Sequence, residues 1–411
     1  MVHAIAKSPS VDVVYAAPGN PGMAGEAELL DLDISDLPAL TLVVADLEID
    51  LTVVGPEAPL ADGIGDVFAE SGLRIFGPVQ AAAELEASKV FAKEFCFRHG
   101  IPTAAAKVVS SADDARDAAR AFGFPVVLKA DGLAAGKGVL IVQTETELDS
   151  AIDDLFISRR FGAASDRVLV EECLEGVEVS FMVISDGIRV EPFATSHDYK
   201  RVGDGDSGPN TGGMGSHSPA FALSDELRRE IEEKVIRPTV EGMAAEGREY
   251  RGILYAGLML TEDGPKVLEF NCRLGDPETQ SVLRRLEGDF AAVLRDAADG
   301  MLEPGSMKWK NEVGACVVLA ADGYPAGPCL GDEISGIDDA NAMPGVVVFH
   351  AGTRLEGGRL LTAGGRVLSV TALGETLGGA VNLAYRAADR IRFDGVHRRS
   401  DIGADTMKKI G

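Results

Sequence analysis

Residues 131–138, Asp-Gly-Leu-Ala-Ala-Gly-Lys-Gly, form the short segment of the chain whose composition is most suggestive of chemistry. Glycines let the backbone amides approach an anion closely, and Lys137 adds a positive charge that phosphate oxygens attract. The spacing matches neither a Walker A loop nor a dinucleotide-binding fingerprint. From these residues alone, a structural turn and a phosphate-binding loop both remain open.

Lys129 precedes this segment, at the end of an apolar strand predicted over 125–129. Because side chains alternate along a strand, Lys129 shares one face with Val127 and Asp131. A buried ammonium without a partner costs several kcal/mol, on the order of the desolvation penalty of one ion. Lys129 is therefore either an edge lysine that reaches solvent or a contact to nucleotide phosphate.

Glu269 and Asn271 lie two residues apart on the strand predicted over 266–271, and alternation places Val267 on the same face. Two oxygen ligands so spaced suit Mg²⁺, a hard cation that also binds phosphates, although these residues alone favour a solvated strand face. Glu178 and Ser180 share a strand face in the same way. Glu178 could accept hydrogen bonds from ribose hydroxyls or be simply exposed.

Two segments rich in charge and glycine, 197–215 and 271–280, are predicted to be binding loops, since they have no apolar reason to be ordered. Arg273 in the second could bind a carboxylate or phosphate in two-point fashion. No Ser/His/Asp or Cys/His arrangement is convincing. Activation by phosphoryl transfer is thus favoured over covalent catalysis by a side chain.

The elements that must position these residues follow a mixed α and β pattern. Strands are predicted within 11–17, 51–54 and 73–76, each running into a Gly/Pro loop, which is typical of a parallel α/β domain. A helix is predicted from Leu85 through Lys93 to near Gly100. Further predicted elements are strands over 168–172, 315–320, 346–350 and 366–371 and a closing helix with apolar residues from Leu377 to Ile391. We expect three domains, over 1–78, 79–307 and 308–411.

Composition limits the function classes. The 411 residues carry a net charge of −26, which argues against a general binder of nucleic acid or anionic membranes. Five scattered cysteines without Cys-x-x-Cys spacing argue against disulfides and zinc, so a reducing cytoplasm is expected. No apolar run approaches the length of a membrane span, and no signal peptide is visible.

Taken together, these segments resemble the phosphoribosylamine–glycine ligases (glycinamide ribonucleotide synthetases) of the ATP-grasp superfamily, over nearly the whole chain. The most specific motif is 273–280, Arg-Leu-Gly-Asp-Pro-Glu-Thr-Gln. Residues 208–215, 129–138 and 17–22 match in the same order. The resemblance implies an α/β and α+β multidomain fold, with an N-terminal parallel α/β domain, a central ATP-grasp domain and a small mixed β/α C-terminal domain.

The resemblance also implies a reaction: ATP, glycine and 5-phosphoribosylamine give glycinamide ribonucleotide, ADP and phosphate through a glycyl phosphate. Arg273 and Lys137 would be catalytic, and Mg²⁺ or Mn²⁺ would be bound by Glu269 and Asn271. The implied ATP-binding residues are Lys89, Lys129, Gly136, Lys137, Gly138, Glu171, Leu174 and Glu178. The implied substrate-binding residues are Gly19, Asn20, Gly55, Glu57, Asp198, Arg273 and Asp276. The partners would be these small molecules alone, with no nucleic acid and no membrane, and the enzyme would be a monomer.

Three departures from the family pattern are visible. The family opens with a strand and a glycine-rich turn, whereas this chain begins at Met1-Val2-His3, so the first strand is expected to be missing and ribosylamine binding to be weak. Arg398 stands where the family has an aromatic residue, with a local packing effect expected. No acidic residue on 254–260 supplies a third metal ligand. The alternatives are another ATP-grasp acid–amine ligase and a truncated nucleotide-binding form without turnover.

Overall fold

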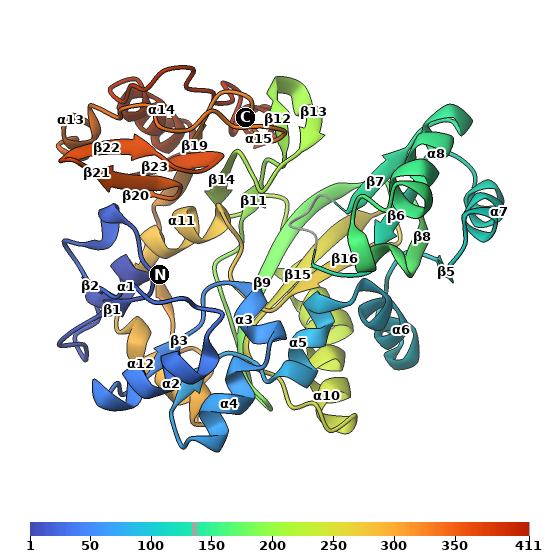
Figure 1. Ribbon diagram of the computed structural model, residues 1–411, viewed down its shortest axis with the longest axis horizontal. Coiled ribbons are helices and arrows are strands. Elements are labelled where there is room, and N and C mark those ends of the chain that lie inside the picture. The colour runs from blue at the N-terminus through green and yellow to red at the C-terminus, as the bar shows by residue number, and fades with distance from the viewer. Residues whose placement is uncertain (134–137, 411) are drawn as a thin grey trace. The chain divides into compact units, whose positions relative to one another are not determined.

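The computed structural model describes residues 1–133 and 138–410. Its contacts divide the chain into two compact units. Unit 1 comprises Met1–Leu51, Val190–Phe221 and Leu274–Gly411, and unit 2 comprises Thr52–Arg189 and Ala222–Arg273. Each unit therefore combines segments that are distant in the sequence, as the different colours of their elements show in Figure 1.

The helices and strands of unit 2 form a first set that ends at residue 130 and a second set that follows it. The first set is β3 (Thr52–Val53), α3 (Glu57–Ala61), α4 (Ile64–Glu70), β4 (Ile75–Phe76), α5 (Gln80–Ala87), α6 (Lys89–His99), β5 (Ala106–Val109), α7 (Ala112–Phe122) and β6 (Val126–Ala130). The second set is β7 (Val139–Val142), α8 (Glu145–Ile152), β8 (Val168–Glu172), β9 (Val177–Asp186), α9 (Asp225–Ile231), α10 (Arg237–Ala245), β15 (Arg251–Thr261) and β16 (Gly264–Asn271).

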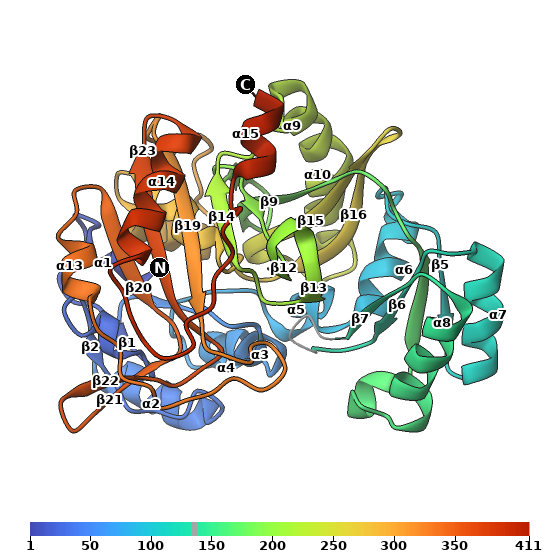
Figure 2. The ribbon, with the colours of Figure 1, turned by 90° about the horizontal axis from the view of Figure 1, so that it is seen from above.

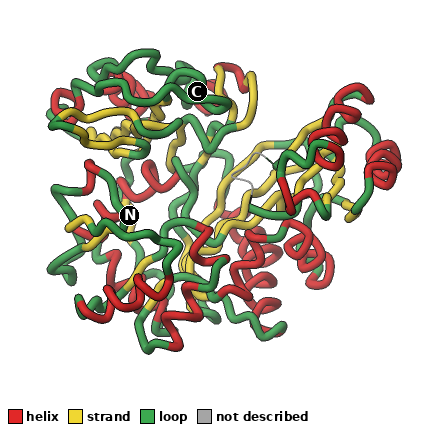
Figure 3. The backbone as a smooth tube through the Cα atoms, viewed as in Figure 1, coloured by secondary structure: helices red, strands yellow, loops and turns green. Residues whose placement is uncertain are grey.

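One sheet of unit 2 has the strand order β5-β8-β6-β7, and its neighbouring strands are antiparallel. Val126, Leu128 and Ala130 of β6 face a core formed with α7 and α8. Figure 3 shows these two helices in red beside the yellow strands. Because β6 is an inner strand and is buried along its whole length, Lys129 on its opposite face cannot be an edge lysine.

The other sheet of unit 2 is built on β9, β15 and β16, paired antiparallel in that order. Between Gly257 and Leu258 of β15 the register with β16 shifts, because Gly257 pairs with Glu269 whereas Leu258 pairs with Val267. Leu268 is thus the extra residue of a β-bulge. The bulge reverses the alternation, so Val267 and Glu269 lie on opposite faces, and the prediction that they share a face was wrong.

Unit 1 contains the two ends of the chain and a central segment. Its helices are α1 (Val2–Ala6), α2 (Leu37–Asp46), α11 (Glu278–Val282), α12 (Phe290–Ala298), α13 (Ile337–Asn341), α14 (Leu377–Ala388) and α15 (Ala404–Ile410). Its strands are β1 (Tyr15–Ala16), β2 (Glu28–Leu29), β10 (Val190–Pro192), β11 (His197–Asp198), β12 (Arg201–Gly203), β13 (Ser207–Asn210), β14 (Gly215–Ser218), β17 (Leu286–Glu287), β18 (Lys308–Trp309), β19 (Val313–Ala320), β20 (Val346–His350), β21 (Thr353–Glu356), β22 (Arg359–Thr362) and β23 (Arg366–Gly374).

The main sheet of unit 1 has the order β11-β14-β19-β23-β20. Ala315 of β19 packs against Leu377 and Val381 of α14, which Figure 2 shows beside β19 and β23. A side chain on the preceding Gly314 would instead collide with the backbone of Ser281 in α11. Since successive residues of a strand face opposite sides, α14 and α11 cover opposite faces of this sheet.

The structure confirms most predicted elements but shortens the early strands. Strands over 168–172 and 346–350 have the predicted bounds, and α14 matches the closing helix up to Ala388. The strands predicted over 11–17, 51–54 and 73–76 are each only two residues long and correspond to β1, β3 and β4. β3 and β4 pair in parallel with each other, whereas β1 pairs in parallel with β2. The segment 197–215 is not simply a loop, because it contains β11, β12 and β13.

Candidate active site

Ser88 breaks the helix that the sequence predicts from Leu85 to near Gly100. Its backbone is extended (φ −128°, ψ 113°), and its hydroxyl accepts a hydrogen bond from the Phe91 amide as the N-cap of α6. The same hydroxyl donates to Asp131 Oδ1 (2.8 Å), which also accepts from the Val90 amide. The break therefore fixes the first residue of α6, Lys89, whose ammonium donates to the Gly132 carbonyl (2.8 Å).

Lys129 and Lys93 share one buried carboxylate. Glu171 of β8 lies 2.8 Å from Lys129 Nζ through Oε2 and 3.0 Å from Lys93 Nζ through Oε1. The Lys129 ammonium also donates to the carbonyl of Leu268 (2.9 Å), the bulged residue of β16. Because a bulged residue leaves the regular ladder, its carbonyl is available to orient this lysine.

The three lysines form a cationic cluster that suits a polyanion. Burial lowers the pKa of Lys89, an effect that nearby Glu269 opposes and Lys129 reinforces. Burial likewise lowers the pKa of Lys93, although Glu171 opposes it. Desolvated cations held close together are stabilised by a bound anion, so this cluster is suited to phosphate groups.

Glu269 and Asn271 occupy one face at the end of β16, since they pair with Gly257 and Tyr255 of β15. Both are only partly buried, whereas Val267 and Phe270 on the other face are buried. Carboxylate and amide oxygens in this position fit a hard divalent cation. Within residues 1–133 and 138–410, no group of three His, Cys, Asp or Glu side chains is close enough to bind a metal by itself.

Arg273 is held by two carboxylates. Its guanidinium lies 3.3 Å from Glu57 at the start of α3 and 3.2 Å from Glu86 of α5, and it donates to Asn271 Oδ1 (3.3 Å). Glu86 also accepts from the Cys272 amide (2.6 Å). Burial raises the pKa of Glu86 to about 7, against the opposing effects of Arg273 and the Cys272 amide.

Three of the remaining ATP-binding candidates, Glu171, Leu174 and Glu178, lie at or beside the connection between β8 and β9, which joins the two sheets of unit 2. Leu174 is half-buried between β8 and β9, and Glu178 is the second residue of β9. Glu171 directs its side chain to the lysines, and its backbone lies within the inner strand β8, opposite Ala106 of β5 and Val127 of β6. Gly138 is buried and its carbonyl accepts from the Ala130 amide (2.9 Å). Gly136 and Lys137 lie outside the described residues.

Asp198 and Asp276, the candidates for the glycine ammonium, lie together in unit 1. A side chain on Gly213 would collide with Pro277 and approach Asp198 Oδ1 to 2.8 Å. Arg366 of β23 bonds to Asp276 through both its side-chain oxygen (2.8 Å) and its carbonyl (2.8 Å). The same guanidinium donates to the Gly212 carbonyl (2.6 Å), so Arg366 connects the two segments that carry the aspartates.

The four candidates for the ribosylamine fall into different units. Asn20 in unit 1 donates to the His350 carbonyl (2.9 Å) and accepts from the Gly22 amide (3.0 Å), next to Gly19 in a left-handed conformation (φ 70°). Gly55 and Glu57 belong to unit 2, where Glu57 contacts Arg273. The structure thus groups these residues in two pairs.

Sequence reasoning missed Lys93, Glu86 and Arg366. Lys93 follows Lys89 by four residues, so helical spacing alone places both on one side of α6. Glu86 and Arg366 carry no such signal, since each is separated from its partner by a long stretch of chain.

Comparison with known proteins gives the family. The N, ATP-grasp (A) and C domains of phosphoribosylglycinamide synthetase match residues 1–86, 87–279 and 314–405, which is a three-domain architecture. The phosphoribosylamine–glycine ligase of Vibrio cholerae is 49% identical over 402 residues, covering 97% of this chain and 94% of that protein.

Solved structures agree. The phosphoribosylamine–glycine ligase of Thermotoga maritima matches with a TM-score of 0.84 and 34% identity over 98% of this chain and 96% of its own. A biotin carboxylase–βγ-ATP complex from Campylobacter jejuni, 18% identical over 94% of this chain and 86% of its own, shares the fold with a TM-score of 0.69. Because all three domains match, the sequence identity extends along the chain and the fold is the same, this chain belongs to the phosphoribosylglycinamide synthetase family.

Proposed function

We propose that this chain ligates glycine to 5-phosphoribosylamine at the expense of ATP, giving glycinamide ribonucleotide, ADP and phosphate in de novo purine biosynthesis. The observation that carries the proposal, beside family membership, is the cationic cluster of Lys89, Lys93 and Lys129 beside Arg273, Glu269 and Asn271. Such a cluster matches the charge of a nucleoside triphosphate.

In the first step, a carboxylate oxygen of glycine attacks the γ-phosphorus of ATP and the bond to ADP breaks, which leaves a glycyl phosphate. Lys89, Lys129 and Gly138 contact the ATP phosphates. Glu171 and Leu174 contact adenine through their backbone, and Glu178 binds the ribose. Glu269 and Asn271 hold Mg²⁺ or Mn²⁺, which neutralises phosphate charge when bound.

In the second step, the amine nitrogen of phosphoribosylamine attacks the glycyl carbonyl, inorganic phosphate leaves, and the nitrogen loses a proton. Arg273 steadies the charge on the acyl phosphate, and Glu57 and Glu86 hold Arg273 in place. Asp198, with Asp276, binds the glycine ammonium, while Gly19, Asn20, Gly55 and Glu57 contact the ribosylamine.

The setting of the reaction is part of the same proposal. Every helix within residues 1–133 and 138–410 is too short or too polar to cross a bilayer. All five cysteines are free thiols, which supports a reducing compartment such as the cytoplasm. We further propose that the enzyme is a monomer with domains over 1–78, 79–307 and 308–411.

The test is glycine-dependent release of ADP, with phosphoribosylamine generated in situ from ribose 5-phosphate and ammonia. We expect turnover by the wild-type chain and a loss of about a hundredfold or more in Lys129→Met, because a phosphate contact is removed. Lys107→Met is the matched control, since Lys107 is exposed on β5 of the same sheet and its variant should keep full activity. ADP release that another amino acid stimulates better than glycine would contradict the choice of substrate.

A further inference from the structure

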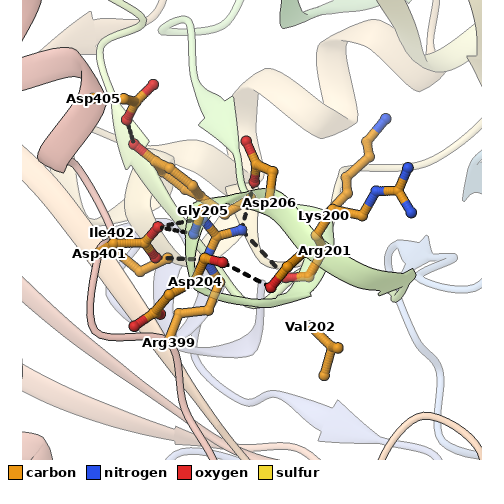
Figure 4. Close-up of polar contacts among 12 residues, drawn as sticks. Lys200, Arg201, Val202, Asp204, Gly205, Asp206, Arg399, Asp401, Ile402 and Asp405 are labelled. Carbon is orange, nitrogen blue, oxygen red and sulfur yellow. Dashed lines mark hydrogen bonds and ion pairs between the residues drawn. The ribbon is translucent and has the colours of Figure 1, made fainter.

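Arg399, close to the C-terminus, is the largest fully buried side chain of the molecule among the described residues, with 1% of its surface exposed. Its guanidinium forms a two-point contact with Asp401, from Nε (2.7 Å) and from the second terminal nitrogen (2.8 Å). The other terminal nitrogen donates to Asp206 (2.7 Å) and to the Arg201 carbonyl (3.3 Å). Figure 4 shows this side chain enclosed by the hairpin of β12 and β13 and by the C-terminal segment.

Neighbouring residues of the C-terminal segment hold the same hairpin. The Ser400 amide donates to Asp204 (2.8 Å), and the Ser400 hydroxyl also bonds to that carboxylate. Asp401 accepts from the Gly205 amide (2.8 Å), and a ring nitrogen of His397 lies 2.9 Å from the Val202 carbonyl oxygen. We call the set of contacts from 397–401 to 201–206 the C-terminal clasp.

Besides the clasp, the hairpin has a short ladder and two internal side-chain bonds, from Arg201 to the Gly208 carbonyl (2.7 Å) and from the Ser207 hydroxyl to the Asp204 carbonyl (2.8 Å). Its ladder joins only Arg201 to Asn210 and Gly203 to Ser207, and residues 204–209 are exposed. Asp206 has a positive φ of 53°, a conformation that is unfavourable for a residue with a side chain. Because exposed polar residues bury no apolar surface, the clasp must offset the entropy of ordering this turn.

The clasp is coupled to the aspartate that we assign to glycine. The Arg399 guanidinium lies over the ring of Tyr199, 5.0 Å from its centroid, and Tyr199 follows Asp198 directly. The Tyr199 carbonyl accepts from the Met214 amide (2.8 Å), and the Lys200 carbonyl accepts from the Thr211 amide (2.8 Å). Arg399 thus contacts the tyrosine beside Asp198, whose hydroxyl also donates to Asp405 (2.6 Å) and accepts from the Gly403 amide (2.9 Å) of the same C-terminal segment.

We propose that Arg399 is a positioning residue for the glycine site: through the C-terminal clasp it orders the hairpin of β12 and β13 and so sets Asp198 for the substrate ammonium. This inference rests on the proposed function. It extends that function by giving residues 397–401 a role in substrate affinity without contact to substrate.

The test compares Arg399→Met with Arg398→Met in the full-length chain. Arg398 is the matched control, because its guanidinium contacts Asp389 and the face of Tyr385 and takes no part in the clasp. Two quantities are measured: the steady-state constants, and the rate at which trypsin cleaves after Lys200 or Arg201, with products identified by mass spectrometry. Tryptic cleavage needs no turnover, so it reports on the hairpin alone.

For Arg399→Met we expect cleavage at 200–201 about tenfold faster and KM for glycine about tenfold higher, with KM for ATP unchanged. Arg399→Lys should partly restore the slow cleavage and the low KM for glycine, since one ammonium replaces only some of the contacts of the planar guanidinium. If Arg399→Met does not fold, Asp206→Asn, which removes one exposed partner of Arg399, should show the same changes to a smaller degree.

Wild-type values for both cleavage and KM for glycine in Arg399→Met would overturn the inference. Equal effects in Arg398→Met would overturn it also, because the effect would then not belong to the clasp. Faster cleavage in a protein whose wild-type form shows no glycine-dependent turnover would support the clasp while refuting the proposed function.

Discussion

At the scale of single residues, Arg273 depends on the buried carboxylate of Glu86. Glu86→Gln keeps the shape of the side chain and can still accept from the Cys272 amide, but it removes the charge that faces the guanidinium. Because charge-assisted contacts position Arg273 for the acyl phosphate, we expect kcat to fall about tenfold with a smaller change in KM for ATP.

Glu84→Gln is the control for this measurement, since Glu84 lies on the same helix and pairs with Arg248 at the surface. An unchanged kcat in Glu86→Gln would mean that Glu57 and Asn271 hold Arg273 without help.

At the scale of elements, the break at Ser88 turns a helix into two and places Lys89 at the start of α6. Ser88→Ala removes the N-cap and the bond to Asp131, so we expect a loss of about 1–2 kcal/mol in the free energy of unfolding together with a higher KM for ATP. Ser111→Ala removes the equivalent cap of α7 and should cost similar stability without affecting ATP. Equal KM values in the two variants would refute a role of the break in positioning Lys89.

The same break shows what the sequence can and cannot predict. Periodicity and turn residues were sufficient to predict the long strands and α14, and the resemblance supplied the family. Periodicity could not reveal the break, because the Ser88 side chain that caps α6 bonds to Asp131, which lies far along the chain. Alternation likewise failed at Val267, because the bulge at Leu268 arises from pairing with β15. Local patterns carry no information about such partners.

The C-terminal helix α15 offers a pH-dependent contact in unit 1. His217 of β14 is fully buried, and one ring nitrogen lies 3.1 Å from the Thr406 hydroxyl of α15. Burial, with a smaller effect of His197, lowers the pKa of His217 to about 4. The unfolded chain binds this proton near pH 6.5 and the folded chain only near 4, so stability is lost as the pH falls between these values.

We therefore expect the free energy of unfolding to fall by a few kcal/mol, about 1.4 per pH unit over that range, from this group. The measurement is chemical denaturation between pH 7 and pH 4.5, comparing the wild-type chain with His217→Gln. The variant should show a shallower decline. Parallel curves would mean that other groups cause the acid sensitivity.

At the scale of the whole molecule, a net charge of −26 makes electrostatic repulsion a property of the entire chain. The ion pairs at its surface contribute little individually, about 0–1 kcal/mol each, and salt screens them as it screens the repulsion. Raising the ionic strength from 0.01 to 0.15 M shortens the screening length from about 30 to about 8 Å, so the unfavourable sum of like charges should weaken more than the few close pairs.

We expect the Tm at pH 8 to rise by about 3–5 °C over this range of sodium chloride, as followed by calorimetry. At pH 5.5, nearer the isoelectric point of about 4.6, the net charge is smaller and the rise should shrink. A Tm that falls with salt at pH 8 would instead show that local ion pairs, such as those of the C-terminal clasp, outweigh the repulsion between the many carboxylates.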